Sequence, residues 1–498
     1  MADTLWFIIP ELILLAGAVV CAIGGLSSKA AIRRNIGFIA CVFLASSCIS
    51  VPFVYTAEHV ASSNSLMPNL GGYVKFFAAL IGILLVMTSG GLMDRKYEHA
   101  IASGKDTFDT LRSSAGEYHA LLLLSITGLM LICEASDLIW IFLALELVSL
   151  PTYVMAAMSR WAKVGQEAAM KYFFLGAISA GLMLYGFAFL YGATGTFEFH
   201  AMADAFADQK AAGGISTFGQ IGLILALVGL CYKIAAAPMH LYAPDVYQGA
   251  ASAVTAFLAF VPKAAGFIAI IMLLSLVGWE GGLPKSVEMM LWVVAVLTMI
   301  LGNIGALLQT STKRMLGYSS IAHSGYMLIG IIAGPPLGLI AVMVYLVIYG
   351  ATNTAAFSTL ACLQRNGESV DSLEDISGLV KRSPALAASF AISCGSLLGI
   401  PPLFGFWGKL MLFTVGVSAG QLPLVLVAAI SSAISAWYYL RLIGLALLAP
   451  LTARSEQVSP VLRWPLIATI LGAIIAVGGP VTLNALTTDA SIAVHVSE

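Results

Sequence analysis

The chain has 498 residues, of which 60% are apolar and 10% are charged. Globular proteins carry about a quarter charged residues, so this composition excludes a soluble globular domain and predicts an all-α polytopic membrane protein. The formal net charge is −1, which excludes the basic surface that binding to nucleic acid requires. The expected partner at this level is the lipid bilayer.

The chain starts with an apolar stretch without a small-residue cleavage site, which favours a first helix over a removed signal peptide. A span needs roughly 20 apolar residues, and on that basis we expect about fourteen spans. They cover residues 5–24, 36–56, 73–93, 118–134, 137–158, 169–193, 217–240, 250–276, 288–308, 315–334, 337–361, 384–419, 422–448 and 464–487.

The loops between these spans alternate in positive charge. One set of loops holds Lys29, Arg33, Arg34, Arg95, Lys96, Lys105, Arg112, Arg160, Lys163, Lys313, Arg314, Arg365, Lys381, Arg382, Arg454 and Arg463. The opposite set holds Lys210 and Lys285, with Lys75 at the edge of the third span. Because cytoplasmic loops carry an excess of Lys and Arg, the first set is expected in the cytoplasm, and an even number of spans then puts both termini outside.

The sizeable loops lack the motifs of cofactor-binding domains. Residues 94–117, 195–216 and 363–383 contain no βαβ unit with G-x-G-x-x-G and no P-loop. The seven cysteines lie in or beside apolar spans without C-x-x-C or metal-ligand spacing. We therefore expect no nucleotide, flavin, metal or haem site and no disulfide in this chain, so any redox chemistry must come from a partner.

The stretch from 217 to 263 places two lysines inside apolar spans. Lys233 precedes a break at Pro238, and Lys263 follows Pro262 in the next span. Proline removes a backbone donor and clashes with the preceding turn, so the first of these helices is expected to break in mid-membrane. A transmembrane lysine usually faces a hydrated cavity or a partner group and often serves an ion or proton pathway.

A carboxylate, Glu146, lies midway along its own span. It should be protonated or paired with a cation, and Lys233 is the expected partner because each group of such a pair changes the proton affinity of the other. A packing carboxylic acid is the alternative. Lys171 is placed where it could reach Glu146, although a lysine so near a loop can also extend to the interface.

The twelfth region is too long for one simple helix and contains Gly399-Ile-Pro401-Pro402, so we predict a second interrupted helix there, with Lys409 two turns beyond the break. His323 lies well inside its span and could relay protons, or it could be a hydrogen-bonded core histidine. Neighbouring ammonium groups in a low-dielectric site repel one another and lose hydration, so such lysines can exchange protons near neutral pH.

Other polar residues lie nearer the ends of the spans. His240 and Asp245 belong to the turn after the first broken helix, where capping and loop anchoring are expected. Glu11, Glu134 and Asp137 lie close to the outer interface, where we expect solvated helix ends.

Five stretches together resemble the subunit N family of proton-translocating NADH:quinone oxidoreductase, the respiratory complex I subunit that is related to the multisubunit sodium/proton antiporters. The likeness runs from about residue 118 to 448. The stretches are Tyr232-Lys-Ile-Ala-Ala-Ala-Pro-Met-His240, Ala243-Pro-Asp-Val-Tyr-Gln-Gly249, Val254-Thr-Ala-Phe257 with Pro262-Lys263, Lys313-Arg-Met-Leu-Gly-Tyr-Ser-Ser-Ile-Ala-His-Ser-Gly-Tyr326, and Gly399-Ile-Pro-Pro-Leu-Phe-Gly-Phe-Trp-Gly-Lys409.

This resemblance implies fourteen helices with two inverted five-helix repeats and interrupted helices 7 and 12. The implied segments are an amino-terminal three-helix segment (1–117), a first repeat of helices 4–8 (118–276), a second repeat of helices 9–13 (288–448) and a last helix (449–498). It also implies roles in proton transfer for Glu146, Lys233, Lys263 and Lys409, with His323 and Lys171 as further members.

The resemblance further implies a location in the bacterial inner membrane, beside other antiporter-like and small connecting subunits of the membrane arm. NADH, FMN, iron–sulfur clusters and quinone are then expected on partner subunits. Three alternatives stay open. The chain could be a self-standing cation/proton antiporter or a subunit of a multisubunit one, a scaffold whose lysines only hold helices together, or a subunit of a related complex that uses another electron donor.

Overall fold

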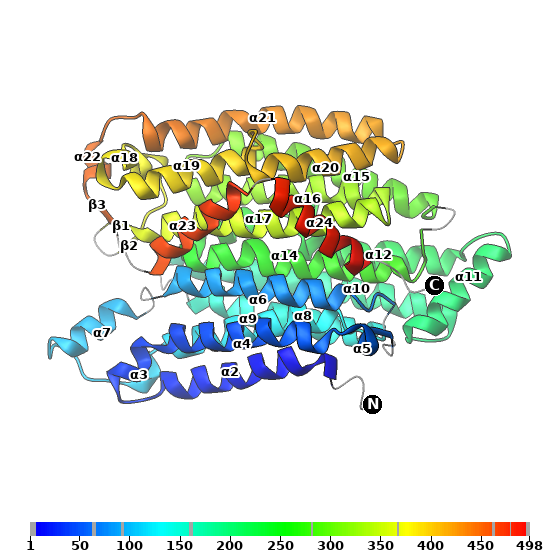
Figure 1. Cartoon of the computed structure of the whole chain (residues 1–498), viewed down its shortest axis with the longest axis horizontal. Helices are drawn as coiled ribbons and strands as arrows, with labels where there is room; N and C mark the ends of the chain where they lie inside the picture. Colours follow the sequence, from blue (N-terminus) through cyan, green and yellow to red (C-terminus); the bar gives the residue numbers. More distant parts are fainter. Residues whose placement is uncertain are drawn as a thin grey trace.

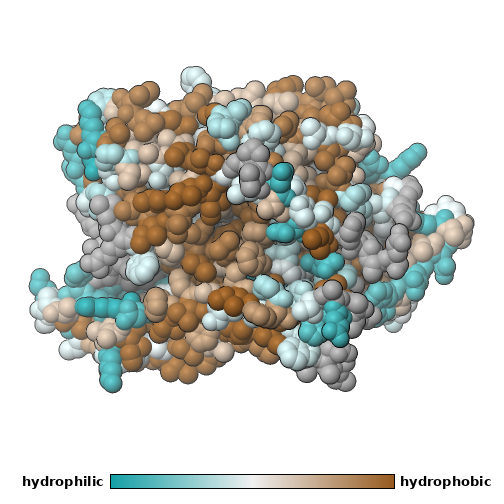
Figure 2. Space-filling view, in the orientation of Figure 1, coloured by the Kyte–Doolittle hydropathy of each residue, from teal (hydrophilic) through white to brown (hydrophobic). Residues whose placement is uncertain are grey.

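The computed structural model describes the chain except residues 1–5, 62–65, 91–93, 159–162, 280–281, 366–367, 461–463, 479 and 495–498. Most described residues are α-helical, and the long helices run side by side along one direction (Figure 1). In Figure 2, hydrophilic side chains gather mainly at the two ends of this bundle, with a hydrophobic belt between them. The prediction of an all-α polytopic membrane protein is confirmed.

Ten helices in the described part of the chain are long and apolar enough to cross a membrane, and five shorter apolar helices accompany them. Two of the five are the halves of one interrupted span, so the structure has the fourteen spans expected from the sequence. The first three are α2 (Ile9–Gly25), α4 (Ile36–Val54) and α6 (Leu70–Ser89).

Two groups of five spans follow, and each has three continuous helices, one interrupted helix and one further helix. The first group is α8 (Ala115–Ile132), α9 (Leu138–Met158), α10 (Lys163–Thr194), α12 (Thr217–Lys233) with α13 (Ala243–Gly249), and α14 (Ser252–Ser275). The second group is α15 (Lys285–Leu307), α16 (Thr312–Ala333), α17 (Leu337–Cys362), α19 (Pro384–Leu398) with α20 (Phe404–Ser418), and α21 (Leu422–Leu447).

The centre of the bundle is formed by α14, α16 and α17, which are buried almost completely. Helices that are apolar on all sides belong in such a position, because no face of them needs water. The outer helices α4 and α10 bury a much smaller share of their residues. Polar side chains on the three central helices therefore lie far from bulk water.

The last span ends earlier than expected. We predicted one helix over 464–487, but α23 (Trp464–Ala476) ends before Gly478 and a separate helix, α24, covers Pro480–Val494. Glycine is a poor helix former and proline favours the first turn of a new helix, which explains the division.

Short elements connect the spans at the two ends of the bundle. The helices are α3 (Ala30–Arg34), α5 (Ala57–Ala61), α7 (Arg95–Ala102), α11 (Phe199–Ala211), α18 (Leu379–Arg382) and α22 (Ala453–Glu456), and the 3₁₀ turns are η1 (Thr110–Arg112) and η2 (Leu373–Ile376). The four short α-helices that contain arginine, α3, α7, α18 and α22, lie at the left-hand end in Figure 1.

The loop cations mostly lie at this end, but one of them is buried in the protein. Lys313 is the second residue of α16, is fully buried and donates a hydrogen bond to the Ala250 carbonyl (2.8 Å), so its assignment to a solvated loop was wrong. Arg160 and Arg463 lie outside the described residues, as do the side chains of Arg95, Lys96 and Lys163.

A three-stranded antiparallel sheet also forms at this end, in loops for which the sequence predicted no strand. Its strands are β1 (Leu363–Arg365), β2 (Glu368–Ser369) and β3 (Val458–Pro460), in the order β2-β1-β3. Two- and three-residue strands leave no periodic pattern, and β3 comes from a loop about ninety residues further along the chain.

Asp375 holds these loops together. Its buried carboxylate accepts hydrogen bonds from Arg365 (2.9 Å), from Arg454 (2.8 Å) and from the backbone N–H of Ser372 (3.0 Å), while Arg382 donates to its carbonyl (2.8 Å). The hydrogen bond to Asp375 raises the pKa of Arg454 above its usual value. A buried carboxylate with several donors is costly to remove, because the donors lose their acceptor.

We expect Asp375→Ala to destabilise the loops at this end of the bundle by about 2–3 kcal/mol, since hydrogen bonds to charged groups contribute about 1.5–3 kcal/mol each and both arginines can regain water. The measurement is thermal inactivation and the amount of the membrane-inserted protein. Asp106→Ala is the control, because its ion pair with Arg112 is exposed and should contribute under about 1 kcal/mol. Equal stability of the two variants would contradict the assignment of Asp375.

Candidate functional site

Glu146 on α9 and Lys233 at the end of α12 form an ion pair. The Lys233 ammonium lies 3.3 Å from Glu146 Oε1 and also donates to the Ser149 hydroxyl (2.5 Å). Lys233 is 4% exposed, whereas the Glu146 side chain is 20% exposed. The pairing predicted from the sequence is present, with the carboxylate on the outer side of the pair.

The break in this span comes earlier than the proline alone suggested. The helix ends at Lys233 itself, and α13 begins at Ala243. The backbone groups released between them have side-chain partners: the Ile234 carbonyl accepts from Ser324 (2.5 Å) and the Ala237 N–H donates to Thr298 (2.9 Å). Irregular backbone at membrane depth persists where protein satisfies it in this way.

Lys263 on α14 is buried against α16. Its ammonium donates to the Ser320 hydroxyl (2.7 Å) and to the Ser320 carbonyl, and it lies 5.0 Å from the centre of the Tyr349 ring. The Ser320 hydroxyl also accepts from Tyr349 (2.7 Å) and lies 3.2 Å from the Tyr247 hydroxyl. No carboxylate pairs with Lys263 among the described residues.

Two serines on α16 connect the surroundings of Lys263 with those of Lys233. Ser320 binds Lys263, and Ser324, one turn later, donates to the carbonyl of Ile234 directly after Lys233. Because residues four apart lie on the same face of a helix, polar groups continue from one lysine to the other. These serines could not be singled out from the sequence, since serine is common in membrane helices.

His323 lies on the same helix and binds two tyrosines from the second group of helices. Its Nδ1 is 2.7 Å from the Tyr345 hydroxyl, and its Nε2 is 3.1 Å from the Tyr439 hydroxyl, which also contacts Ser319. Both ring nitrogens therefore have hydroxyl partners that can donate or accept. Such a histidine can pass a proton from one side of the ring to the other.

Lys409 lies beside the second break, as predicted. Its ammonium donates to the free carbonyl of Leu398, the last residue of α19 (2.8 Å), and to the Ser432 hydroxyl (3.3 Å). It is 5.1 Å from the centre of the Tyr326 ring, and that ring is 5.7 Å from His323. The broken helix thus supplies the acceptor for the lysine.

Lys171 does not reach Glu146, and that part of the interpretation was wrong. Its ammonium forms ion pairs with Asp245 on α13 (2.8 Å) and with Glu167 one turn earlier (2.7 Å). The side chain is 45% exposed, which is expected for a lysine one or two turns from a loop.

A polar cavity of about 190 Å³ surrounds this lysine. It is lined by Glu167, Ala168, Lys171, Asp245, Gln248 and Arg314. Asp245 was expected as a loop anchor, and it joins Lys171 of the first group of helices to Arg314 of the second (2.7 Å). Polar groups lead inward from here.

The next polar groups belong to α9 and α10. The Tyr172 hydroxyl is 3.1 Å from the Thr152 hydroxyl, which donates to the Ser149 carbonyl (2.6 Å), and Ser149 also accepts from Lys233. These hydrogen bonds lead from Tyr172, the neighbour of Lys171 in the chain, to the central ion pair.

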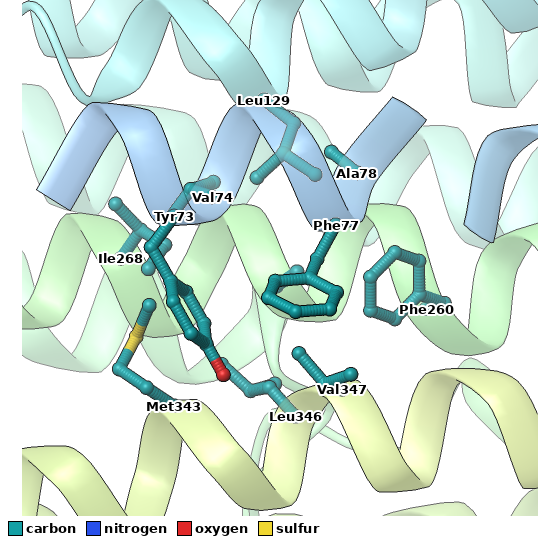
Figure 3. A pocket seen from close by; sticks show the side chains of 11 residues that line it. Tyr73, Val74, Phe77, Ala78, Leu129, Phe260, Ile268, Met343, Leu346 and Val347 are labelled. Carbon is teal, nitrogen blue, oxygen red and sulfur yellow. The ribbon is translucent and has the colours of Figure 1, made fainter. Parts of the chain in front are cut away.

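A second, smaller cavity is lined mainly by apolar side chains. It is an apolar space of about 20 Å³ between α6, α8, α14 and α17, and Figure 3 shows Tyr73, Phe77, Phe260 and Met343 around it. A space of this size holds about one water molecule.

Two predicted solvated glutamates are buried, and the prediction for them was wrong. Glu11 and Glu134 both form ion pairs with Lys75, and the three side chains are almost inaccessible. Opposite charges at the same ends of neighbouring spans could have indicated this cluster. Among the described residues, no group of three His, Cys, Asp or Glu side chains could hold a metal ion.

Comparison with known proteins identifies the family. Residues 135–435 match the family described as NADH:quinone oxidoreductase/Mrp antiporter, TM. A protein of Acidiphilium cryptum named NADH-quinone oxidoreductase subunit N 1 is 39% identical over 386 residues, which cover 77% of this chain and 79% of the relative. The chain belongs to the NADH-quinone oxidoreductase subunit N family. The resemblance recognised in the sequence is therefore confirmed.

Another subunit N protein and two solved structures are also similar to this chain. The subunit N 1 of Solibacter usitatus is 36% identical over 442 residues, covering 88% of this chain and 86% of the relative. A chain of respiratory complex I from Thermus thermophilus superimposes with a TM-score of 0.75 at 30% identity, covering 94% of this subunit N chain and 96% of that chain. A chain of the Mrp complex from Dietzia has a TM-score of 0.80 at 20% identity, covering 100% and 98%, and shows the shared fold.

Proposed function

We propose that this subunit N chain translocates protons in the membrane arm of a bacterial NADH:quinone oxidoreductase. The protons move along a central row of Glu146, Lys233, Lys263, His323 and Lys409. One observation carries the proposal: these titratable groups follow one another through the buried interior, and serine and tyrosine hydroxyls lie between them. Buried ionisable groups in such a line are expensive and typically mark proton or ion pathways.

The energetic demand on each group is modest. Moving one elementary charge across 100 mV costs about 2.3 kcal/mol. A change in the strength of the Glu146–Lys233 pair of this size would change which group holds the proton, because the proton affinities of paired groups depend on each other. A disturbance at Glu146 can therefore travel to Lys233 and onward.

The polar cavity around Lys171 is the proposed site of proton uptake. It lies where α10 and α16 begin, beside the loops rich in Lys and Arg. Lys171 in its wall is followed in the chain by Tyr172, from which hydrogen bonds lead through Thr152 to Ser149, a partner of Lys233. We place this end of the bundle in the cytoplasm of a bacterial cell, because positive loops stay on that side. Both termini then lie outside.

The redox chemistry belongs to partner subunits, which would bind NADH, FMN, iron–sulfur clusters and quinone. Glu146 supports such a partner, because it is partly exposed on a face of α9 that also exposes the apolar side chains of Leu143 and Leu150. Another membrane-arm subunit packed on this face could change the charge next to Glu146. Residues 118–276 and 288–448 would then act as two inverted repeats, preceded by the three-helix segment and followed by the last helix.

The test is Lys263→Met in the assembled complex. Methionine has a similar length but no group that can bind or release a proton. NADH oxidation should continue, whereas proton translocation through this chain should fall strongly, because a positioned proton-transfer group contributes about 10²–10⁴-fold to the rate. Proton uptake and NADH oxidation are measured together in sealed membrane vesicles, in sodium-free buffer.

Lys285→Met is the matched control, since that lysine is exposed at the start of α15 and lies outside both the row and the uptake cavity. We expect the control to keep at least half of the proton translocation. If Lys263→Met pumps as well as the control in a fully assembled complex, the row does not carry protons. A requirement for sodium in the wild type would favour cation/proton exchange instead.

A further inference from the structure

The amino-terminal helices hold a charged cluster that is separate from the central row. Glu11 is the third residue of α2, Lys75 is the sixth residue of α6, and Glu134 follows α8 by two residues. The Lys75 ammonium lies 2.7 Å from Glu11 Oε1 and 2.9 Å from Glu134 Oε1. Lys75 and Glu11 are completely buried.

The cluster contains one more acid than base. Lys75 can neutralise one carboxylate, so the cluster carries a net charge of −1 if Glu11 and Glu134 are both ionised. An uncompensated charge away from water is so costly that the group usually takes up or loses a proton instead. Two carboxylates that share one site cannot both ionise easily, for the same reason.

The remaining contacts do not supply a second positive charge. The Lys75 ammonium also donates to the Phe7 carbonyl (2.6 Å), and the Tyr55 hydroxyl donates to Glu134 Oε1. Cys133, which precedes Glu134 in the chain, is buried, and a thiol cannot supply a positive charge. No other cation contacts either glutamate among the described residues.

The contacts of the Glu11 carboxylate leave it able to bind a proton. Its Oε1 lies 2.7 Å from the Lys75 ammonium, and both of its carboxylate oxygens are buried without a hydrogen bond among the described residues. A metal ion is disfavoured at this place, because the Lys75 ammonium already lies between the two carboxylates. The missing positive charge can therefore be supplied by a proton on a carboxyl oxygen.

We propose that Glu11, Lys75 and Glu134 form a second proton-binding site, which holds one proton on a carboxyl group at neutral pH and exchanges it with the aqueous phase near the start of α2. This end of the bundle is opposite the loops rich in Lys and Arg (Figure 1). The site binds α2, α6 and the end of α8 to one another, so the packing of these helices depends on the proton. It does not require the central row to carry protons.

The first test is an infrared measurement on the purified complex. The wild type at neutral pH should show a carbonyl band of a protonated carboxyl group that is absent from Glu11→Gln and from Glu134→Gln, because either change leaves one carboxylate beside Lys75 and no need for a proton. Glu58→Gln is the control, since Glu58 is an exposed acid near the same end. It should keep the band.

The second test is the amount and thermal stability of the assembled complex. Glu11→Gln resembles the protonated acid and should assemble as the wild type does, whereas Lys75→Gln should assemble several-fold less, and adding Glu134→Gln to Lys75→Gln should restore assembly. The wild type should lose thermal stability as pH rises, because proton release leaves a buried charge, and Glu11→Gln should not.

Two results would overturn the proposal. Retention of the carboxyl band in both glutamine variants would mean that Glu11 and Glu134 are ionised. Loss of assembly in Glu11→Gln as severe as in Lys75→Gln would mean that the cluster is a purely structural set of ion pairs. Neither result depends on whether Lys263→Met stops proton translocation, so the two proposals fail separately.

Discussion

Lys233→Ala is expected to leave the complex assembled and to reduce proton transfer along the central row by about a hundredfold or more, which is the low end of what a positioned proton-transfer group contributes. The change removes the partner of Glu146 and the donor to Ser149 together. It also interrupts the row where it meets the polar groups leading from the uptake cavity. Proton translocation and NADH oxidation are measured in the same vesicles, and assembly is followed by immunoblots of the complex.

Lys233→Arg separates the two roles of this lysine. Arginine keeps the positive charge beside Glu146, but it does not release its proton in proteins. We expect Lys233→Arg to assemble normally and to pump as poorly as the alanine variant. Normal pumping by Lys233→Arg would show that the residue acts only as a fixed charge, and normal pumping by Lys233→Ala would remove it from the pathway.

Gly405→Ala is expected to disrupt the second interrupted helix and to leave several-fold less assembled complex. A Cβ atom at this position would lie 2.7 Å from the carbonyl carbon of Ser396 and closer still to its oxygen. These are backbone atoms at the end of α19, so no side-chain rotation can relieve the contact. Overpacking in a core costs about 1–3 kcal/mol even where side chains can adjust.

The change should also affect Lys409, which follows Gly405 by one turn of α20. Lys409 binds the Leu398 carbonyl across the break, so moving the two halves apart lengthens this hydrogen bond. The complex that does assemble should therefore pump less per molecule, measured by proton uptake normalised to subunit content. Gly444→Ala is the control, because a Cβ atom there meets nothing within 4 Å. Equal amounts of assembled complex from both variants would refute the steric argument.

Several features of this protein follow from the sequence alone. The fourteen spans were predictable because a membrane helix satisfies its own backbone, so its signature is a local run of apolar residues. The interruption between α19 and α20 was visible in Gly399 and the prolines after it. The charged residues inside apolar runs were equally visible, and they included Glu146, Lys233, Lys263 and Lys409.

The tertiary structure decided which groups meet. Glu146 and Lys233 are 87 residues apart, and Lys171 and Asp245 are 74 residues apart. The residue pattern within one helix therefore cannot predict that Glu146 pairs with Lys233 and that Lys171 pairs with Asp245. The sequence predicted Glu11 and Glu134 to be solvated helix ends, because only the packing of α2, α6 and α8 removes water from them. Apolar length is a property of one segment, whereas burial and pairing of charges depend on the neighbouring helices.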